Sequence, residues 1–392
     1  MNVLYLDWPC FGQIDAVFTL EHELHHKVTK FFHDGYKDRV NADFSAAFDA
    51  VVEGQSFDFC FSFNFYPILA EDCHRHNLKY ISLLYDNPMV ALYSYRISYP
   101  TNCVFLFDSV IYHHFHDGGL NNVHYTVLPV NSTVIDTMLK KPYDKARTTA
   151  DISFVGALYD EDHNFYDRMY EKIDDFTRGF LDGLVHSQMQ VSGYNFLEEV
   201  LNEHPELIEI MHKAEPYDRN KDGIETLPYI YSSYYLCRKI TSLERIKYLT
   251  AVGAKHPVKM FTLDSAKAIP GVRNMGITDY YGEMPLVFHN SRINLNITLR
   301  SIYAGIPLRC MDILGAGGFL LTNYQQDLCE FFTPGEEFDY FEDETDLLKK
   351  IDYYLEHEDI RAEIAKRGHE KAKEEYSFKK CFTHMLEVAM NS

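Results

Sequence analysis

The stretch YAGIPLRCMDILGAGGFLLTN, residues 303–323, predicts a tight turn, a short helix and a glycine-led apolar strand in direct succession. The turn at Gly305–Pro307 leads into a helix whose first backbone N–H groups lack partners within the helix, so they can hold a diphosphate. Arg309 falls in the first turn, where a guanidinium pairs well with phosphate oxygens. Asp312 follows three residues later and therefore lies on the same face of the helix. This pattern favours a nucleotide site at the start of the helix.

Three glycines close the same stretch: Gly315, Gly317 and Gly318. Without a Cβ atom they let a backbone or a nucleotide approach closely. The alternative is an amphipathic helix with an incidental aspartate and an ordinary glycine turn, and the residues alone leave it open. We favour the nucleotide site because turn, helix and strand fall in the order that such a site needs.

The bulk composition bounds the class of protein. A chain of 392 residues is too long for one ordinary core, so two domains are expected. The net charge of −21 argues against nucleic acid as a partner and against docking on an anionic membrane. No apolar run is long enough to span a bilayer, and the N-terminus lacks the basic region of a signal peptide. We therefore expect a cytoplasmic protein of undetermined oligomeric state.

No metal site is expected. The eight cysteines are scattered without a C-x-x-C pair, which is typical of reduced thiols in a cytosolic protein. Residues 218–229 begin like a calcium-binding loop, but Tyr229 stands where that loop needs a bidentate glutamate. The sequence gives no reason to invoke zinc or calcium.

The chain alternates apolar strands with helical stretches, which predicts βαβ units and parallel sheets. In the first 150 residues the expected strands are 2–7, 29–34, 57–64, 79–86, 103–108 and 123–130. In the second half they are a strand ending at Gly156, then 258–263, 272–278, 293–298 and 317–323, with helices over 160–255 and from Glu344 onward. The fold class is therefore α/β, with two Rossmann-like domains facing a cleft and a C-terminal helical tail.

The domain boundaries follow from the polar segment at residues 140–150, which reads as a linker. We expect an N-terminal domain over 1–145 on the acceptor side and a nucleotide-binding domain over 150–376. A last helix over 377–392 is expected to pack back on the N-terminal domain.

Carboxylates at strand ends are the candidates for catalysis, because ligands of open α/β sheets bind at the carboxyl ends of the strands. Asp86 is the first candidate for a general base, since it ends a central strand and a turn follows. Asp15 is the second, and the pair His113 and His114 offers another choice. For each of them a purely structural role, such as capping the next helix, stays open.

The opening stretch resembles the donor-binding motif of GT-B glycosyltransferases, roughly E-G-F-G-x-x-x-x-E-A-x-x-x-G-x-P. Laid on that motif without a gap, Ala304 falls at the first glutamate, Asp312 at the second and Gly317 at the later glycine. The resemblance implies that Asp312 accepts both ribose hydroxyls. Because Ala304 replaces the first glutamate, the sugar must be selected by other residues.

The whole chain also resembles the spore-maturation-type glycosyltransferase-like proteins, which combine a C-terminal glycosyltransferase half with an N-terminal half of unassigned function. The matching stretches include FSFNFYPI, LLYDNP, DISFVGALYDE and INLNITLRSI. The GT-B plan further implies that Gly156 lies against the donor phosphates and that Gly276 lies in the loop that reads the base. Asn294 and Arg300, on and just past the preceding strand, are further donor-side candidates.

We therefore expect a bacterial, metal-independent hexosyltransferase without cofactors, moving a sugar from a nucleoside-diphosphate sugar to a glycan or protein acceptor. The alternatives are a non-catalytic nucleotide-sugar or glycan-binding protein, and a same-fold nucleotide-sugar epimerase or hydrolase.

Overall fold

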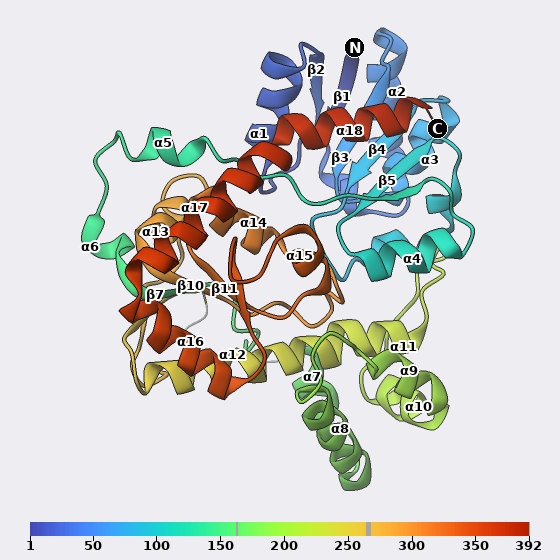
Figure 1. Cartoon of the computed structure of the whole chain (residues 1–392). Coiled ribbons are helices and arrows are strands. Elements are labelled where there is room, and N and C mark those ends of the chain that lie inside the picture. The colour runs from blue at the N-terminus through green and yellow to red at the C-terminus, as the bar shows by residue number, and fades with distance from the viewer. Residues whose placement is uncertain (162–163, 264–267, 392) are drawn as a thin grey trace. The chain divides into compact units, whose positions relative to one another are not determined.

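The computed structural model describes residues 1–161, 164–263 and 268–391 (Figure 1). These residues form two compact units. The first contains residues 1–129, 218–225 and 376–391, and the second contains 130–217 and 226–375. The first boundary between the two units falls at residues 129–130, before the linker expected at 140–150. Ser392, the end of the expected last helix, lies outside the described residues.

The first unit is built on a six-stranded parallel sheet in the order β2-β1-β3-β4-β5-β6. Every residue of β3 and β5 is buried, as expected for parallel strands covered by helices on both faces. The strands are β1 (Asn2–Leu6), β2 (Lys27–Phe31), β3 (Phe59–Phe63), β4 (Tyr80–Leu83), β5 (Asn102–Leu106) and β6 (Val123–Tyr125).

All six strands lie within the predicted regions or overlap them, and the largest differences from the predicted bounds are at β2 and β6. β2 begins two residues before the predicted 29–34, because its parallel register pairs Lys27 with Asn2 at the start of β1. β6 ends at Tyr125 rather than at residue 130, because its partner β5 ends at Leu106, opposite Tyr125. In both cases the neighbouring strand, which is distant in sequence, sets the end.

The helices of the first unit fill the connections between its strands and add the last helix of the chain. Phe382 of α18 packs on Phe61 of β3 with ring centroids 5.1 Å apart. The helical segments are α1 (Gln13–Phe18), η1 (Thr19–Glu23), η2 (Asp34–Lys37), α2 (Ala42–Gly54), α3 (Pro67–Arg75), η3 (Val90–Tyr93), η4 (Tyr95–Ser98), α4 (Ser109–Asp117) and α18 (Phe378–Asn391).

The calcium-like segment 218–225 belongs to this first unit. The Asp222 side chain is only 6% exposed and forms an ion pair of 3.0 Å with Arg39. Its carboxylate also accepts a hydrogen bond of 2.6 Å from the Ser94 hydroxyl. Asp222 is therefore a structural anchor for this segment.

The second unit is built on a second six-stranded parallel sheet, in the order β12-β11-β10-β7-β8-β9. The strands are β7 (Ala150–Val155), β8 (Val258–Phe261), β9 (Val272–Asn274), β10 (Ser291–Asn296), β11 (Leu320–Asn323) and β12 (Asp339–Phe341). The chain builds outward from β7 in one direction and then from β10 in the other. The carboxyl ends of β7 and β10 are thus the topological switch point, where open α/β sheets bind ligands.

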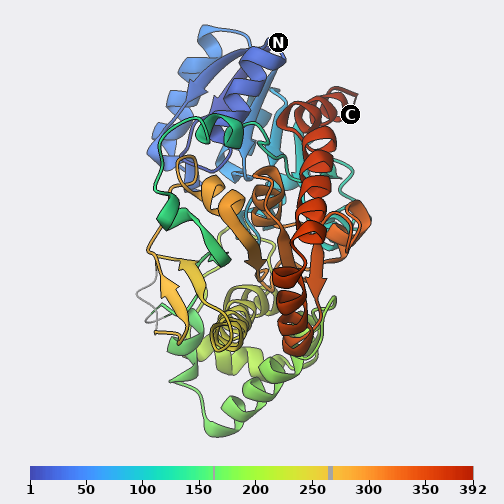
Figure 2. The ribbon, with the colours of Figure 1, turned by 60° about the vertical axis from the view of Figure 1, so that its left-hand side comes forward.

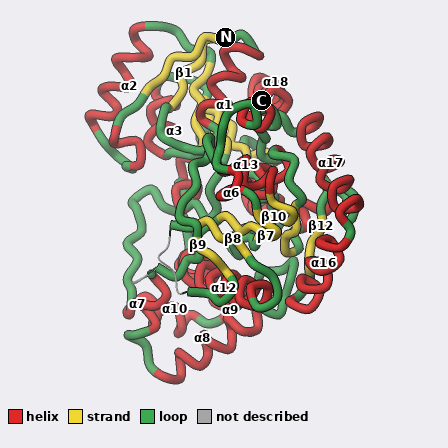
Figure 3. Tube along the Cα trace, turned by 90° about the vertical axis from the view of Figure 1, so that its left-hand side faces the viewer, coloured by secondary structure: helices red, strands yellow, loops and turns green. Residues whose placement is uncertain are grey.

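The helices of the second unit include a long helical segment between β7 and β8 (Figures 2 and 3). They are α5 (Val134–Met138), α6 (Lys145–Thr148), α7 (Phe165–Tyr170), α8 (Asp175–Gln188), α9 (Leu197–Glu203), α10 (Pro205–Ala214), α11 (Leu227–Ile230), η5 (Tyr231–Leu236), α12 (Cys237–Gly253), α13 (Met284–Asn290), α14 (Leu308–Gly315), α15 (Gln326–Phe331), α16 (Glu344–Glu356) and α17 (Glu358–Glu375).

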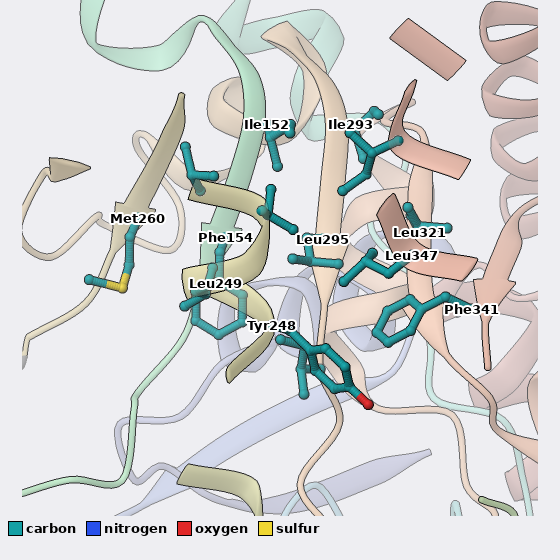
Figure 4. Packing of buried hydrophobic residues seen from close by; sticks show 14 of the residues in the cluster. Ile152, Phe154, Tyr248, Leu249, Met260, Ile293, Leu295, Leu321, Phe341 and Leu347 are labelled. Atoms are coloured by element: carbon teal, nitrogen blue, oxygen red, sulfur yellow. The ribbon is translucent and has the colours of Figure 1, made fainter. Parts of the chain in front are cut away.

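One large hydrophobic cluster of the second unit lies on one face of its sheet. Phe154 and Leu295, from β7 and β10, pack there with Leu249 of α12 and Leu347 of α16 (Figure 4). Burying these apolar side chains holds the two halves of the sheet together at the switch point. The two parallel sheets with covering helices confirm the expected α/β class.

Candidate functional site

The loop after β10 leads into α14, so a turn is followed by a short helix, as the sequence of residues 303–323 predicts. Pro307 precedes the helix in an extended conformation, with φ −61° and ψ 147°. Ala304 is buried, and its carbonyl oxygen accepts a hydrogen bond of 3.1 Å from the Asp327 backbone N–H. The turn before α14 is therefore fixed by backbone contacts to α15.

Arg309 and Asp312 lie on the same face of α14, with the guanidinium 3.1 Å from Asp312 Oδ2. The Tyr280 hydroxyl donates a hydrogen bond of 2.8 Å to Asp312 Oδ1. Tyr280 lies in the loop between β9 and α13, and no local pattern in the sequence indicates this contact. Arg309, Asp312 and Tyr280 are called the α14 cluster below.

Asp312 is a largely buried carboxylate, with 15% of its side chain exposed. Burial raises its pKa to about 6 from the usual 3.8, against the opposing effects of Arg309 and Tyr280. The Arg309 guanidinium lies 5.5 Å from the Phe288 ring centroid and is 23% exposed. A ligand at this face therefore meets one partly exposed cation and a carboxylate that can accept hydrogen bonds from hydroxyl groups.

Gly315, Gly317 and Gly318 lie at or just past the C-terminal end of α14, opposite its free N–H groups. Gly317 has a φ of 72°, and its N–H donates to Leu314 O at 3.0 Å, while the Gly318 N–H donates to Ile313 O at 3.0 Å. This is the pattern of a helix C-cap, which favours glycine at the left-handed position. A Cβ atom on Gly315 would lie 2.1 Å from Val130 Cγ2. Gly315 and Gly317 thus have packing and capping roles, away from the start of the helix.

Gly156 follows β7 at the switch point, and its backbone N–H donates a hydrogen bond of 3.1 Å to Phe261 O. A buried arginine lies beside it. Arg245 of α12 donates from its guanidinium to Ala157 O and, at 2.6 and 3.0 Å, to Ile297 O. Arg245 therefore joins the loops that follow β7 and β10. Sequence reasoning missed it because a charged residue in a helix reads as solvent-exposed.

Asn294 and Arg300 have protein partners. Asn294 accepts a hydrogen bond of 2.8 Å from Ser153 and donates one of 2.9 Å to Phe288 O. Arg300 donates to both carboxylate oxygens of Glu244, a side chain that is 4% exposed. These contacts tie β10 to β7, and the loop after β10 to α12.

Gly276 lies in the loop after β9 with a φ of 77°. Its N–H donates a hydrogen bond of 2.9 Å to Asn274 Oδ1. The Arg147 guanidinium donates to Met275 O at 2.7 Å and to Ile277 O at 2.9 Å. The loop that was expected to read the base is therefore held on both sides of Gly276, and it leads directly to Tyr280.

In the first unit, Asp86 lies just past β4 and is exposed. Asn64, just past β3, holds it: the Asn64 side chain donates 2.7 Å to Asp86 Oδ2 and accepts from the Asp86 backbone N–H at 3.1 Å. Asn64 has a φ of 60°, a left-handed conformation that asparagine adopts more readily than most residues. Asp86 is thus a positioned, water-accessible carboxylate.

Asp15 lies in the first turn of α1, which follows β1 at the same carboxyl edge of the sheet. Other expected candidates have local roles. The Asp108 carboxylate caps α4 by accepting from Val110 and Ile111 N–H groups at 3.1 and 3.3 Å. His113 pairs with Asp117 at 3.4 Å within α4.

No three histidine, cysteine, aspartate or glutamate side chains gather in a metal-binding arrangement within residues 1–161, 164–263 and 268–391. Over the same described part of the chain, no helix combines the length and apolar character needed to cross a bilayer.

Residues 243–387 match the family model described as Glycosyl transferase-like. The matched segment contains α14 and the whole α14 cluster. A search of curated protein sequences finds no match. The family match and the fold together support a GT-B glycosyltransferase.

Solved structures resemble the chain over its full length. They include the Anabaena protein HepE in complex with UDP and glucose, with TM-score 0.52, 11% identity and 100% of both chains covered. A glycosyltransferase from Rickettsia africae gives TM-score 0.52 at 9% identity, covering 100% of this chain and 98% of that one. Sucrose-phosphate synthase from Thermosynechococcus elongatus gives 0.51 at 11% identity, with the same coverage. At such identities the likeness is one of fold, and the fold is GT-B.

Proposed function

We propose that the protein is a glycosyltransferase that moves a hexose from a nucleoside-diphosphate sugar to a glycan or protein acceptor. The observation that carries the proposal is the α14 cluster, in which Arg309, Asp312 and Tyr280 converge at the start of a helix within the matched segment. A helix N-terminus, a guanidinium and a hydroxyl-accepting carboxylate together suit a diphosphate joined to a ribose.

On the donor side, Arg309 and the first N–H groups of α14 bind the diphosphate, and Asp312 accepts hydrogen bonds from the ribose. To do so, Arg309 must exchange part of its contact with Asp312 for the phosphates. UDP is the nucleotide to test first, because the structurally similar HepE was crystallised with UDP and glucose. Buried Ala304 offers no carboxylate to the sugar, so hexose selection falls to other residues.

On the acceptor side, Asp86 takes the proton from the acceptor hydroxyl as that oxygen attacks the anomeric carbon and the nucleoside diphosphate leaves. Asn64 fixes the Asp86 carboxylate while leaving it open to water. Asp15 is the second candidate for this base. We further propose that the enzyme works without a bound metal in the cytoplasm and belongs with the spore-maturation-type group.

The test separates transfer from its alternatives. UDP-glucose at about a hundred times its Kd should stabilise the protein by about 2.7 kcal/mol and raise its melting temperature. UDP release that depends on an acceptor identifies a transferase, release without an acceptor identifies a hydrolase, and binding without release identifies a binding protein. Asp312→Ala, which should weaken nucleotide binding by about tenfold or more, should cut this stabilisation to about half or less and should reduce the release. If no nucleoside diphosphate shifts the melting temperature, the proposal is wrong.

A further inference from the structure

A small pocket lies at the carboxyl edge of the second sheet, in the unit that contains the α14 cluster. The loops after β10 and β11, together with residues 193–195, enclose about 310 Å³ of space that opens to solvent. Ligand pockets begin at about 300 Å³, so this one suits a single sugar ring or a part of it. No residue of the α14 cluster lines the pocket, and Arg300 is the one donor-side candidate that does.

The pocket borders the turn that leads into α14. Its wall between Thr298 and Tyr303 ends directly before Ala304, the position at which the GT-B donor motif has a glutamate for the sugar. The Asn296 side chain donates hydrogen bonds to Thr298 Oγ1 in this wall, at 3.0 Å, and to Cys310 Sγ in the first turn of α14, at 3.4 Å. A sugar joined to a diphosphate at the start of α14 can therefore reach this pocket.

Gln325 is a buried carboxamide in the wall of this pocket, with 4% of its surface exposed. It occupies the N-cap position of α15, but its side chain does not cap that helix. In the described ranges 1–161, 164–263 and 268–391, no protein group forms a hydrogen bond with the Gln325 carboxamide. A buried polar group without a partner costs stability, so it calls for a ligand or an ordered water. A ligand in the pocket can supply the missing partner.

The neighbouring Tyr324 adds a second group of this kind. Packing fixes its ring: the centroid lies 5.4 Å from that of Tyr340, and a Cβ atom on Gly193 would lie 2.9 Å from Tyr324 Cε1. Over the same described ranges, no protein group forms a hydrogen bond with the Tyr324 hydroxyl. A fixed ring with a free hydroxyl suits contact with a ligand hydroxyl, because the phenol both donates and accepts.

The other polar side chains of the wall have protein partners. Asn195 donates to Arg300 O at 3.0 Å, and Asn323 accepts from the Thr298 N–H at 2.7 Å. The charge of the Arg300 side chain is paired with Glu244. The free groups of the wall are thus neutral, and they both donate and accept hydrogen bonds. Such groups match sugar hydroxyls, and they offer no charge to compensate a buried carboxylate.

We propose that Gln325 and Tyr324 select the hexose of the donor by hydrogen bonds to its hydroxyl groups, in place of the carboxylate that is absent at Ala304. The Gln325 amide donates to one sugar oxygen and accepts from a sugar hydroxyl, and the Tyr324 hydroxyl provides a further contact. The inference rests on the proposed function, because it takes the sugar to be joined to a diphosphate at the start of α14. It assigns sugar selection to the loop after β11.

The test is calorimetric titration of the full chain with UDP, UDP-glucose and UDP-galactose. Gln325→Ala should raise the Kd of the tighter-binding sugar donor by about tenfold or more, and Tyr324→Phe should also raise it, because each removes hydrogen bonds to the hexose. The Kd of UDP, which lacks the hexose, should not change in either variant. Gln326→Ala is the matched control: this glutamine is exposed and bound to Glu330 at 2.9 Å, so its loss should change none of these constants.

Deoxy donors then show whether the contact is direct. Among the 2-, 3-, 4- and 6-deoxy analogues of the tighter-binding donor, at least one should bind the wild-type protein about tenfold more weakly. Gln325→Ala should bind that analogue and the parent donor with similar Kd values, because the two changes remove the same hydrogen bond.

Three results would overturn the proposal. They are an unchanged Kd of the sugar donor in Gln325→Ala, an equal loss of UDP affinity in that variant, and additive effects of Gln325→Ala with every deoxygenation. If UDP binds the wild-type protein normally, the first and third results refute the role of the pocket and leave the proposed function standing. If neither UDP nor a UDP-sugar binds the wild-type protein, the proposed donor site is wrong, and this inference fails with it.

Discussion

The Tyr280 hydroxyl donates a hydrogen bond of 2.8 Å to Asp312, across 32 residues of sequence. This contact and the Arg309 ion pair hold a carboxylate that burial would otherwise protonate, since its pKa is already about 6. A buried carboxylate kept near its titration point costs stability at neutral pH, and such costs are typical of binding sites.

The stability of Asp312→Asn relative to the wild-type protein should therefore increase as the pH rises. The folded-state pKa of about 6 exceeds the usual 3.8, so the native protein holds this proton more tightly than the unfolded chain. The bound proton therefore stabilises the folded wild-type protein by at most about 3 kcal/mol. This stabilisation is complete below about pH 4 and is lost as the pH rises through about 6. Urea unfolding of wild type and variant from pH 4 to 7.5 measures the difference. A difference that does not change with pH would contradict this account of Asp312.

Tyr280→Phe should reduce the apparent affinity for the nucleotide by about tenfold, because Asp312 loses a partner that orients it toward the ribose. The KM for the nucleotide sugar and the Kd for UDP should both rise. Tyr353→Phe, at a partly exposed tyrosine of α16, is the control and should leave both constants unchanged. Equal effects of the two substitutions on these constants would show that Tyr280 has no specific role in nucleotide binding.

Asp86→Asn should slow sugar transfer by about a hundredfold or more, the usual contribution of a general base. The thermal shift produced by UDP-glucose should not change, because Asp86 belongs to the first unit and the α14 cluster to the second. Asp117→Asn, at an exposed aspartate of α4, controls for the loss of charge. Full activity in Asp86→Asn would show that Asp86 is not the general base. Asp15 would then be the candidate, and the matching Asp15→Asn variant would test it.

Glu244→Gln should destabilise the protein by about 3 kcal/mol, because it leaves the Arg300 guanidinium without its buried ionic partner. Glu363→Gln breaks an exposed ion pair that solvent screens, and it should lower the stability much less. Chemical denaturation gives both values. In the folded Glu244→Gln protein the affinity for UDP should be unchanged, because Arg300 is bound to protein groups. A marked loss of UDP affinity would indicate that Arg300 does contact the donor.

Activity should survive EDTA. In the proposed chemistry, Arg309 and the first N–H groups of α14 stabilise the negative charge of the leaving diphosphate, which a metal cation does in other enzymes. Activity assays with EDTA, and with Mg²⁺ or Mn²⁺ added back, measure this directly. Full loss with EDTA and recovery with a divalent cation would show that the diphosphate is neutralised by a metal.

The sequence predicted the strands whose signal is local. β3 and β5 are continuous apolar runs that are buried at every position. It missed β12, three residues that include the polar Asp339. Asp339 is satisfied there by Lys350 at 3.0 Å and Tyr354 at 2.7 Å, contacts that only the folded chain brings together.

The same distinction applies to the site. Arg309 and Asp312 are three residues apart on one helix, so their pairing follows from helical geometry. Tyr280 and Arg245 reach their partners across long stretches of chain, and no local pattern marks them. The sequence predicted that Gly315, Gly317 and Gly318 let a backbone or a nucleotide approach closely, and the approach of a nucleotide stays a prediction. A Cβ atom on Gly315 would meet Val130 and one on Gly318 would meet Asn294 and Phe288 O, while the N–H groups of Gly317 and Gly318 close the C-cap of α14.

Isothermal titration of nucleoside diphosphates into wild type and Asp312→Ala tests the central claim most directly. The account predicts that at least one of UDP, GDP, ADP, CDP and dTDP binds the wild-type protein, and that Asp312→Ala weakens that binding by about tenfold or more. Binding that is unaffected by the substitution, or the absence of binding for all five nucleotides, would contradict the assignment of α14 as the donor site.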